Sequence, residues 1–271
     1  MTPNNNETSS IYGPVDSWRF GKSLGVDLIM DPSTCSFNCV YCQLGFIQKI
    51  TTERKIYVPT EKVINDFRES NWKEADVITF SGSGEPTLAA NIGEVIKKIK
   101  ELTATKITIL TNGTLFHQGS VRKDILNADI ISVKLDAPNE KLFQLVNRPA
   151  KGISLDLILQ GINLLKKDIK EKNKKIKLQT QIMFLPQNVS EVSELAKLLN
   201  EIKPDEVALN TPTRPYPSGW DIITRGAHGE DAKKIKFKTT PLKTLTLKEV
   251  KEIEEYLTKS IGIKVLPIYH S

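Results

Sequence analysis

Short apolar runs alternate with longer amphipathic stretches from residue 24 to residue 210. Six of these runs have the length and the apolar, β-branched content of buried strands, and polar or glycine-rich residues follow each run directly. The pattern predicts strands at residues 24–30, 75–80, 106–110, 130–136, 176–184 and 206–210.

Amphipathic stretches separate the expected strands, with apolar residues at helical spacing. Expected helices lie at about residues 63–67, from 91, and at 121–126, 140–146, 154–167, 188–202 and from 246. Thr60 is the expected N-cap of the first helix. Three other helices fit the capping-box pattern, in which the N-cap side chain and a Glu three residues later bond each other's backbone N–H groups. The pairs are Asn91 with Glu94, Asn188 with Glu191, and Thr246 with Glu249.

Six repeats of strand, loop and helix favour parallel strands joined by helical crossovers. We therefore expect an α/β fold, an incomplete (β/α)6 TIM-like barrel with a C-terminal extension. The expected divisions are a disordered tail at residues 1–11, a core at 12–215 and an extension at 216–271. The polar residues that follow the strands would share one face, which carries the chemistry in α/β barrels.

Composition adds few constraints. The chain has 271 residues, of which 39% are hydrophobic, enough for one large α/β domain or two small ones. No apolar run approaches the roughly 20 residues that span a bilayer, and the polar N-terminus does not resemble a secretory signal. The formal net charge of +6 permits an anionic partner such as a nucleotide or RNA without requiring one.

All three cysteines lie in one loop, with the spacing Cys35-x3-Cys39-x2-Cys42. An odd number of closely spaced cysteines disfavours disulfides and favours a reducing cytoplasm. A structural zinc site is an alternative, but it normally needs four ligands in two separated pairs. His117, His228 and His270 are scattered, so no second pair is evident. An iron–sulfur cluster bound by three thiolates fits better, because one iron stays free for another ligand.

The cysteine spacing, with Tyr41 before the last cysteine, resembles the signature of the radical S-adenosylmethionine (SAM) superfamily, and the resemblance extends over about residues 12–214. It implies that Cys35, Cys39 and Cys42 hold a [4Fe–4S] cluster and that SAM chelates the fourth iron. One electron would cleave SAM and give a 5′-deoxyadenosyl radical. The chain has no room for a flavin-binding reductase domain, so an external one-electron donor such as a ferredoxin or flavodoxin is implied.

A second motif supports this resemblance. The turn Gly82-Ser83-Gly84-Glu85 is similar to the Gly-Gly-Glu-Pro turn that binds the SAM amino group in the family, although Ser83 interrupts the glycine pair. Glycines allow a backbone to approach a ligand closely, and Glu85 is expected to accept from the SAM ammonium. The other expected cofactor contacts are Tyr41, Thr111, Asn112, Lys134, Asp136, Gln181 and Asn210, with Arg148 and Arg214 as candidates for an anionic substrate. Lys134 and Asp136 fit equally well as an ion pair at the barrel rim.

The opening Tyr12-Gly-Pro-Val, together with Thr211-Pro-Thr-Arg-Pro, resembles small radical SAM proteins related to archaeal wyosine-type tRNA synthases. Those synthases make 4-demethylwyosine from N1-methylguanosine and pyruvate in tRNA. They use a second cluster, for which this chain has no cysteines. We therefore expect a single-cluster radical SAM enzyme whose substrate is a tRNA base or another molecule. The alternative is a non-catalytic, metal-stabilised RNA-binding protein.

Overall fold

The computed structural model describes residues 8–212, 216–220, 225, 238–240 and 242–267. Its main feature is an eight-stranded sheet in the order β1-β2-β5-β6-β7-β8-β9-β12. The strands are β1 (Ile11–Ser17), β2 (Gly21–Val26), β5 (Val77–Phe80), β6 (Lys106–Thr111), β7 (Ile130–Lys134), β8 (Lys177–Met183), β9 (Glu206–Asn210) and β12 (Lys264–Leu266). All neighbours pair in parallel except β1 and β2, which form an antiparallel hairpin.

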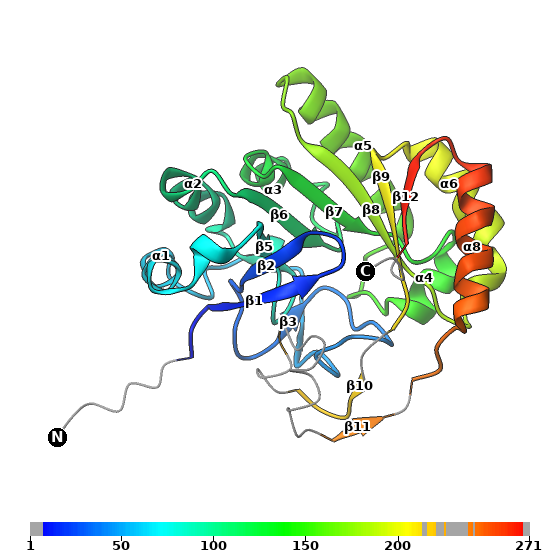
Figure 1. Cartoon of the computed structure of the whole chain (residues 1–271), viewed down its shortest axis with the longest axis horizontal. Coiled ribbons are helices and arrows are strands. Elements are labelled where there is room, and N and C mark those ends of the chain that lie inside the picture. Colours follow the sequence, from blue (N-terminus) through cyan, green and yellow to red (C-terminus); the bar gives the residue numbers. More distant parts are fainter. Residues whose placement is uncertain (1–7, 213–215, 221–224, 226–237, 241, 268–271) are drawn as a thin grey trace.

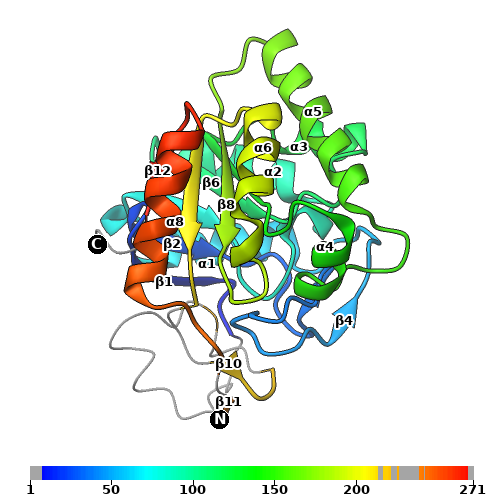
Figure 2. The ribbon, with the colours of Figure 1, turned by 90° about the vertical axis from the view of Figure 1, so that its right-hand side faces the viewer.

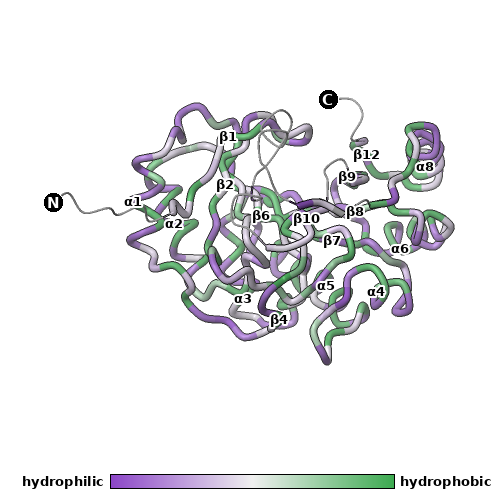
Figure 3. Tube along the Cα trace, turned by 90° about the horizontal axis from the view of Figure 1, so that it is seen from below, coloured by the Kyte–Doolittle hydropathy of each residue, from purple (hydrophilic) through white to green (hydrophobic). Residues whose placement is uncertain are grey.

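Helices cover the outer side of this curled sheet (Figure 1). They are α1 (Thr60–Glu69), α2 (Ile92–Leu102), α3 (Gly119–Ile125), α4 (Glu140–Val146), α5 (Leu155–Glu171), α6 (Val192–Ile202) and α8 (Leu247–Ser260). Seen from below, the strands form an arc that remains open between its edge strands β1 and β12 (Figure 3). The expected incomplete α/β barrel is thus confirmed.

The core lies between the sheet and these helices. Phe67 of α1, Phe80 of β5 and Phe116 before α3 are fully buried within one continuous cluster. Each such side chain contributes roughly 1.5–3 kcal/mol by leaving water. This packing fixes the strands and so fixes the positions of the loops that follow them.

Both edge strands of the sheet lie outside the six strands that the apolar runs predict. The segment before the first expected strand forms β1, and Ser10 next to it is fully buried, with its backbone N–H and its hydroxyl both donating to Asp66 at 2.7 Å. Gly13 and Pro14 had made this stretch resemble a loop. At the other end, β12 pairs with β9 through Val265 and Val207. The segment expected as an extension therefore supplies a seventh parallel strand.

The helix starts test the capping predictions. The capping box of Thr246 and Glu249 is confirmed, whereas those at Asn91 and Asn188 are wrong. The Asn91 amide instead donates to the Val58 carbonyl and the Thr60 hydroxyl, and Asn188 donates to the carbonyls of Asp136 and Met183. Pro59, not Thr60, is the N-cap of α1. Long-range partners outcompete the local cap at these positions.

A loop that holds the cysteines folds beneath the sheet. It contains the two short parallel strands β3 (Thr34–Cys35) and β4 (Lys49–Ile50). In both Figures 1 and 2 this loop lies at the same lower end of the molecule as β10 (Tyr216–Pro217) and β11 (Thr239–Thr240). This is the carboxyl end of the parallel strands, where α/β barrels place their chemistry. No helix among the described residues is long and apolar enough to cross a membrane.

Candidate active site

A cavity of about 320 Å³ opens at the carboxyl end of the strands. Its walls come from the β1–β2 hairpin, the cysteine loop and the ends of β5, β6, β7, β8 and β9. Twelve of the residues expected from the sequence to form the site line it. They are Cys35, Cys39, Tyr41, Cys42, Gly82, Gly84, Glu85, Thr111, Asn112, Lys134, Gln181 and Asn210. The fold thus brings together positions that are up to 175 residues apart, from Cys35 to Asn210.

The three cysteine thiols lie on one side of this cavity. Burial raises the pKa of each thiol, and burial together with Asp136 and Cys42 raises the pKa of Cys39 to about 12. Thiolates are the form that binds metal, so assembly of a metal centre here must displace protons. Strong metal–sulfur bonds would have to provide the driving force.

Two side-chain amides point at the thiols. The amide nitrogen of Asn112 lies 3.6 Å from Cys35 Sγ, and that of Asn147 lies 3.5 Å from Cys39 Sγ. Both orientations are fixed by other bonds, because the Asn112 oxygen accepts from the Thr114 backbone N–H and the Asn147 nitrogen donates to the Asp136 carboxylate. Donors at these distances stabilise negative charge on sulfur.

The donor set fits an iron–sulfur cluster. Three thiols face one cavity with amide donors behind them, which is the ligand chemistry of such clusters. No group of three or more His, Cys, Asp or Glu side chains in the described ranges is arranged around a single metal ion. Cluster cysteines each ligate a separate iron, so a cluster does not require such convergence.

The glycine turn after β5 packs against the cysteine loop. The Thr34 backbone N–H donates to the Ser83 carbonyl at 3.0 Å, and the Glu85 N–H donates to the Thr34 carbonyl at 3.1 Å. A Cβ on Gly84 would lie 1.7 Å from that Thr34 oxygen. We had expected the glycines to allow close approach of a ligand, but at Gly84 the close neighbour is the cysteine loop itself.

Ser83, the departure from the family turn, has a partner of its own. Its side chain is fully buried and does not line the cavity, and its hydroxyl donates to Asp27 at 2.5 Å. The same Asp27 oxygen accepts from Arg225 at 3.0 Å, with only 6% of the Arg225 side chain and 1% of the Asp27 side chain exposed. This buried pair joins a residue of the C-terminal segment to the glycine turn. Arg225 also lines the cavity.

Glu85 is held by protein donors. One carboxylate oxygen accepts from the Thr87 backbone N–H and hydroxyl and from the Thr111 hydroxyl, and the other accepts from the Asn112 N–H at 2.8 Å. Burial raises the pKa of Glu85, against these hydrogen bonds, which lower it. Glu85 therefore ties the glycine turn to the end of β6 and still faces the cavity.

Asp136 is placed differently from expectation. It does not line the cavity, its side chain is fully buried, and its carboxylate accepts from the Tyr41 hydroxyl, from Asn147 and from the Met183 backbone N–H. It holds Tyr41, Asn147 and the Met183 backbone in place behind Cys39. Lys134 lies 3.9 Å from Asp136 and above the Tyr41 ring, where it reaches the cavity.

Several site residues were not evident from the sequence. The guanidinium carbon of Arg19, at the tip of the β1–β2 hairpin, lies 5.4 Å from the ring centroid of Trp18 and 5.2 Å from that of Phe20, and Arg19 donates to the side-chain oxygen of Gln181. Trp18 and Arg19 both line the cavity. The sequence did not indicate these two residues as part of the site, because the glycine-rich segment that contains them resembles a loop and not a hairpin. Arg148, a candidate substrate residue, is exposed and outside the cavity, and Arg214 lies outside the described residues.

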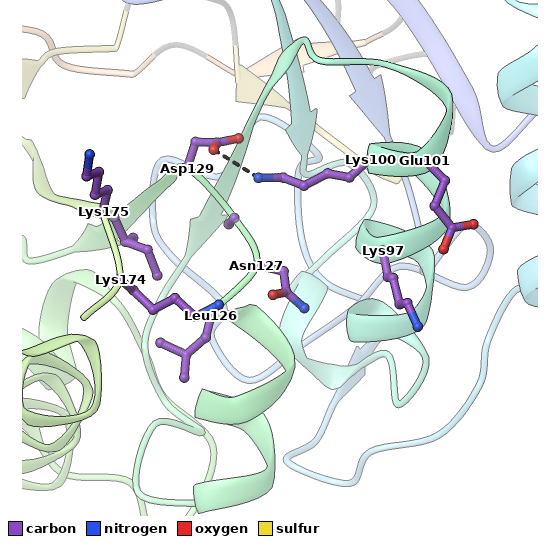
Figure 4. A pocket seen from close by; sticks show the side chains of 10 residues that line it. Lys97, Lys100, Glu101, Leu126, Asn127, Asp129, Lys174 and Lys175 are labelled. Carbon is purple, nitrogen blue, oxygen red and sulfur yellow. Dashed lines mark hydrogen bonds and ion pairs between the residues drawn. The ribbon is translucent and has the colours of Figure 1, made fainter. Parts of the chain in front are cut away.

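A second cavity, of about 510 Å³, lies at the opposite end of the strands (Figure 4). Lysines dominate its rim, including Lys97, Lys174 and Lys175. The carboxylate of Asp129 at this cavity already pairs with Lys100 at 2.9 Å and accepts from the Ile107 N–H. No cysteine or histidine is among the residues that line this cavity, and no side chain there is arranged as a nucleophile beside a base.

Comparison with known proteins agrees with this geometry. The family model described as Radical SAM superfamily matches residues 31–199. A UPF0026 protein of Synechocystis sp. is 45% identical over 219 residues, covering 81% of each chain. SuiB of Streptococcus suis, solved with S-adenosylmethionine, has a TM-score of 0.60 at 18% identity over 88% of this chain and 49% of its own. TYW1 with a lysine–pyruvate adduct has a TM-score of 0.57 at 16% identity over 89% of this chain and 74% of its own.

Proposed function

The chain belongs to the radical SAM superfamily and is a radical SAM enzyme, and we propose that Cys35, Cys39 and Cys42 bind its [4Fe–4S] cluster. The observation that carries this assignment is that the three thiols and the Gly82–Glu85 turn share one cavity. When bound, the cluster and SAM supply an electron and a 5′-deoxyadenosyl radical that abstracts a hydrogen atom from the substrate.

The residues around the thiols hold and orient these groups. The Asn112 amide donates toward the Cys35 sulfur and is held by Thr114. The Asn147 amide donates toward the Cys39 sulfur and is held by Asp136. Glu85 fixes the glycine turn, so that its backbone faces the cavity in one conformation. We assign Lys134, Gln181 and Asn210 to the orientation of SAM, since their polar groups line the same cavity at three neighbouring strand ends.

Apolar side chains limit the access of water near the thiols. Phe37, Tyr41, Leu44 and Ile47 are buried and line the cavity. Apolar walls of this kind keep solvent away from a radical formed in the cavity. The chain therefore provides both the ligands and the exclusion that this chemistry needs.

As substrate we propose a base in tRNA. Support comes from the resemblance to wyosine-type synthases and from Trp18 and Arg19 at the cavity wall. Aromatic rings and arginine planes are the groups on which splayed RNA bases stack. The modified nucleosides of tRNA from a deletion strain test this: one nucleoside should disappear, and an unchanged set would count against tRNA.

Anaerobic reconstitution with iron and sulfide tests the cluster assignment. The protein should turn brown and bind about four irons per chain. A colourless protein that retains one tightly bound zinc would contradict the assignment, because zinc has no redox chemistry.

A further inference from the structure

Three exposed apolar side chains lie around the cysteine loop. Phe46, Ile50 and Leu145 are 51%, 47% and 51% exposed, and they are among only seven large apolar residues exposed in the described parts of the chain. Exposed apolar side chains clustered on one face commonly mark an interaction surface. Here their positions relative to the cysteines are informative.

Each of these side chains belongs to a segment that is directly bonded to a cysteine or its neighbour. Ile50 is the strand partner of Cys35 in the β3–β4 pair. Phe46 follows Gly45, whose N–H donates to the Cys42 carbonyl at 3.0 Å. Leu145 precedes Val146, whose carbonyl accepts from the Val40 N–H beside Cys39. Backbone pairing or hydrogen bonds thus link the segment around each cysteine to a segment that carries one of the three exposed apolar side chains.

Cations accompany these apolar side chains. Lys49 adjoins Ile50, and Arg148 and Lys151 follow Leu145 in the segment that is bonded to the cysteine loop. All three are exposed, and in the described part of the chain none of them forms an ion pair. Glu140, an exposed acid in the helix of Leu145, already accepts from the Leu155 N–H and the Gln144 amide. The residues of this cluster-side face are Phe46, Lys49, Ile50, Leu145, Arg148 and Lys151.

We propose that the cluster-side face docks a small acidic one-electron carrier protein, which reduces the cluster. The proposal rests on the assigned function of the three cysteines. One electron passes to the cluster, and the carrier is oxidised by one electron. Exposed cations steer an acidic partner and raise its association rate, and electron-transfer encounters need only a small interface of this kind.

An RNA partner is a weaker reading of the same surface. Cations alone would suit phosphates, but three exposed apolar side chains on segments bonded to the cysteine loop do nothing for a phosphate backbone. They do bring a partner's redox centre toward the cluster ligands. The placement therefore favours the electron carrier.

Anaerobic reduction of the reconstituted protein tests the proposal, with a reduced flavodoxin as one electron source and dithionite as the other. The test variants are Phe46→Ser with Ile50→Ser, and Lys49→Glu with Lys151→Glu. Matched controls are Leu247→Ser on α8 and Lys174→Glu at the opposite end of the strands, both exposed positions. We expect the variant with Lys49→Glu and Lys151→Glu to lose roughly tenfold in the flavodoxin-driven rate at low salt, as for other steered encounters. The variant with Phe46→Ser and Ile50→Ser changes no charge, so its loss should be similar at low and high salt, and the controls should behave as wild type.

The dithionite arm separates this proposal from the assigned function. All variants should be reduced by dithionite at the wild-type rate and should still form 5′-deoxyadenosine. Wild-type flavodoxin rates in both test variants would overturn the docking site, as would equal losses in the controls. Weaker tRNA binding with an unchanged flavodoxin rate would identify the face as an RNA surface instead. Failure of wild type with dithionite would contradict the cluster assignment, and the docking proposal with it.

Discussion

The side-chain amide of Asn147 lies 3.5 Å from the sulfur of Cys39 and donates at 2.7 Å to the buried carboxylate of Asp136. One amide therefore links a cysteine thiol to the network behind it. Asp136 also holds Tyr41 of the cysteine loop and the backbone N–H of Met183 on β8. The position of Cys39 is thus fixed by three segments that are distant in the sequence.

This relationship predicts an effect on the cluster's potential. Asn147→Leu removes an N–H donor that stabilises negative charge on sulfur, so reduction should become less favourable. We expect a drop of up to roughly tenfold in the reduction equilibrium, which is about 59 mV for one electron. Potentiometric titration monitored by electron paramagnetic resonance measures it. Asn200→Leu is the control, because in the described part of the chain its amide donates to the Ser260 carbonyl and to no cysteine. An unchanged potential in Asn147→Leu at full iron content would refute the role of the amide.

The buried pair of Asp27 and Arg225 predicts strong coupling. Asp27→Asn leaves a buried guanidinium without its counter-charge and weakens the acceptor of the Ser83 hydroxyl, and such changes cost about 3–5 kcal/mol. Adding Arg225→Met should recover part of this loss, since no buried charge then remains. Urea unfolding of the two single variants and the double variant measures the coupling, and simple additivity of the three values would show that the pair is not energetically linked.

The hydrogen bond between Ser83 and Asp27 should also influence SAM binding. Ser83→Ala keeps the backbone of the glycine turn but removes its hydroxyl bond to Asp27, which is worth about 1–2 kcal/mol. We expect the KM for SAM to rise by roughly 3-fold to 10-fold with little change in kcat, because the turn becomes less rigid. Equal falls in kcat and kcat/KM would instead indicate a role in the chemical step.

Gly84 predicts a steric effect on cluster assembly. A Cβ there would lie 1.7 Å from the Thr34 carbonyl oxygen, so Gly84→Ala must separate the glycine turn from the cysteine loop. We expect most of the bound iron to be lost after reconstitution. Gly262→Ala, where a Cβ meets nothing within 4 Å, serves as the control. Normal iron content in Gly84→Ala would show that the contact between the turn and the loop is dispensable.

Glu206 predicts a pH-dependent contribution to stability. It accepts from Lys177 of β8 at 2.9 Å and from Lys264 of β12 at 3.1 Å, and so joins three strands. Burial alone raises the pKa of Glu206, but the hydrogen bonds and charges of the two lysines outweigh it, and the pKa lies below its usual value. A carboxyl with a lowered pKa stabilises the fold above its unfolded pKa and loses that contribution as the pH falls through the folded pKa.

Glu206→Gln should therefore cost about 1–2 kcal/mol at pH 7, and this cost should shrink progressively as the pH falls below the ordinary pKa of a glutamate, about 4.3. Urea unfolding at pH 7 and at an acidic pH where the protein is still folded measures the difference. Glu171→Gln is the control, because its exposed pair with Lys167 at 3.7 Å is worth less than about 0.5 kcal/mol. A loss in Glu206→Gln of the same size at both pH values would mean that the ion pairs contribute nothing.

The sequence predicted the strands and the thiols because their signals are local. Six apolar runs became β2 and β5 to β9, and the cysteine spacing lies within one loop. The hairpin strand β1 was missed because Gly13 and Pro14 interrupt its pattern, although Val15 and Ser23 still pair across it. Short-range patterns identify elements well when no unusual residue lies inside them.

Long-range partnerships could not be predicted in the same way. Asn188 fits a helix cap, yet its amide is recruited by the Asp136 carbonyl 52 residues away. Asp136 comes just after a strand, a position that suggests a cofactor contact. In the structure its carboxylate accepts hydrogen bonds from Tyr41 of the cysteine loop and from Asn147. Arg225 meets Asp27 across 198 residues. Such contacts depend on how the strands are brought together, which a single sequence does not display.

The most direct test of the central claim is the formation of 5′-deoxyadenosine from SAM under dithionite, with wild type and Cys39→Ala compared after the same anaerobic reconstitution. Thermal melting before reconstitution confirms that both chains are folded. We predict that wild type forms 5′-deoxyadenosine and that Cys39→Ala, which lacks one of the three proposed cluster ligands, forms none above background. A folded Cys39→Ala variant with wild-type turnover, or a wild-type protein that binds iron but forms no 5′-deoxyadenosine, would contradict the account.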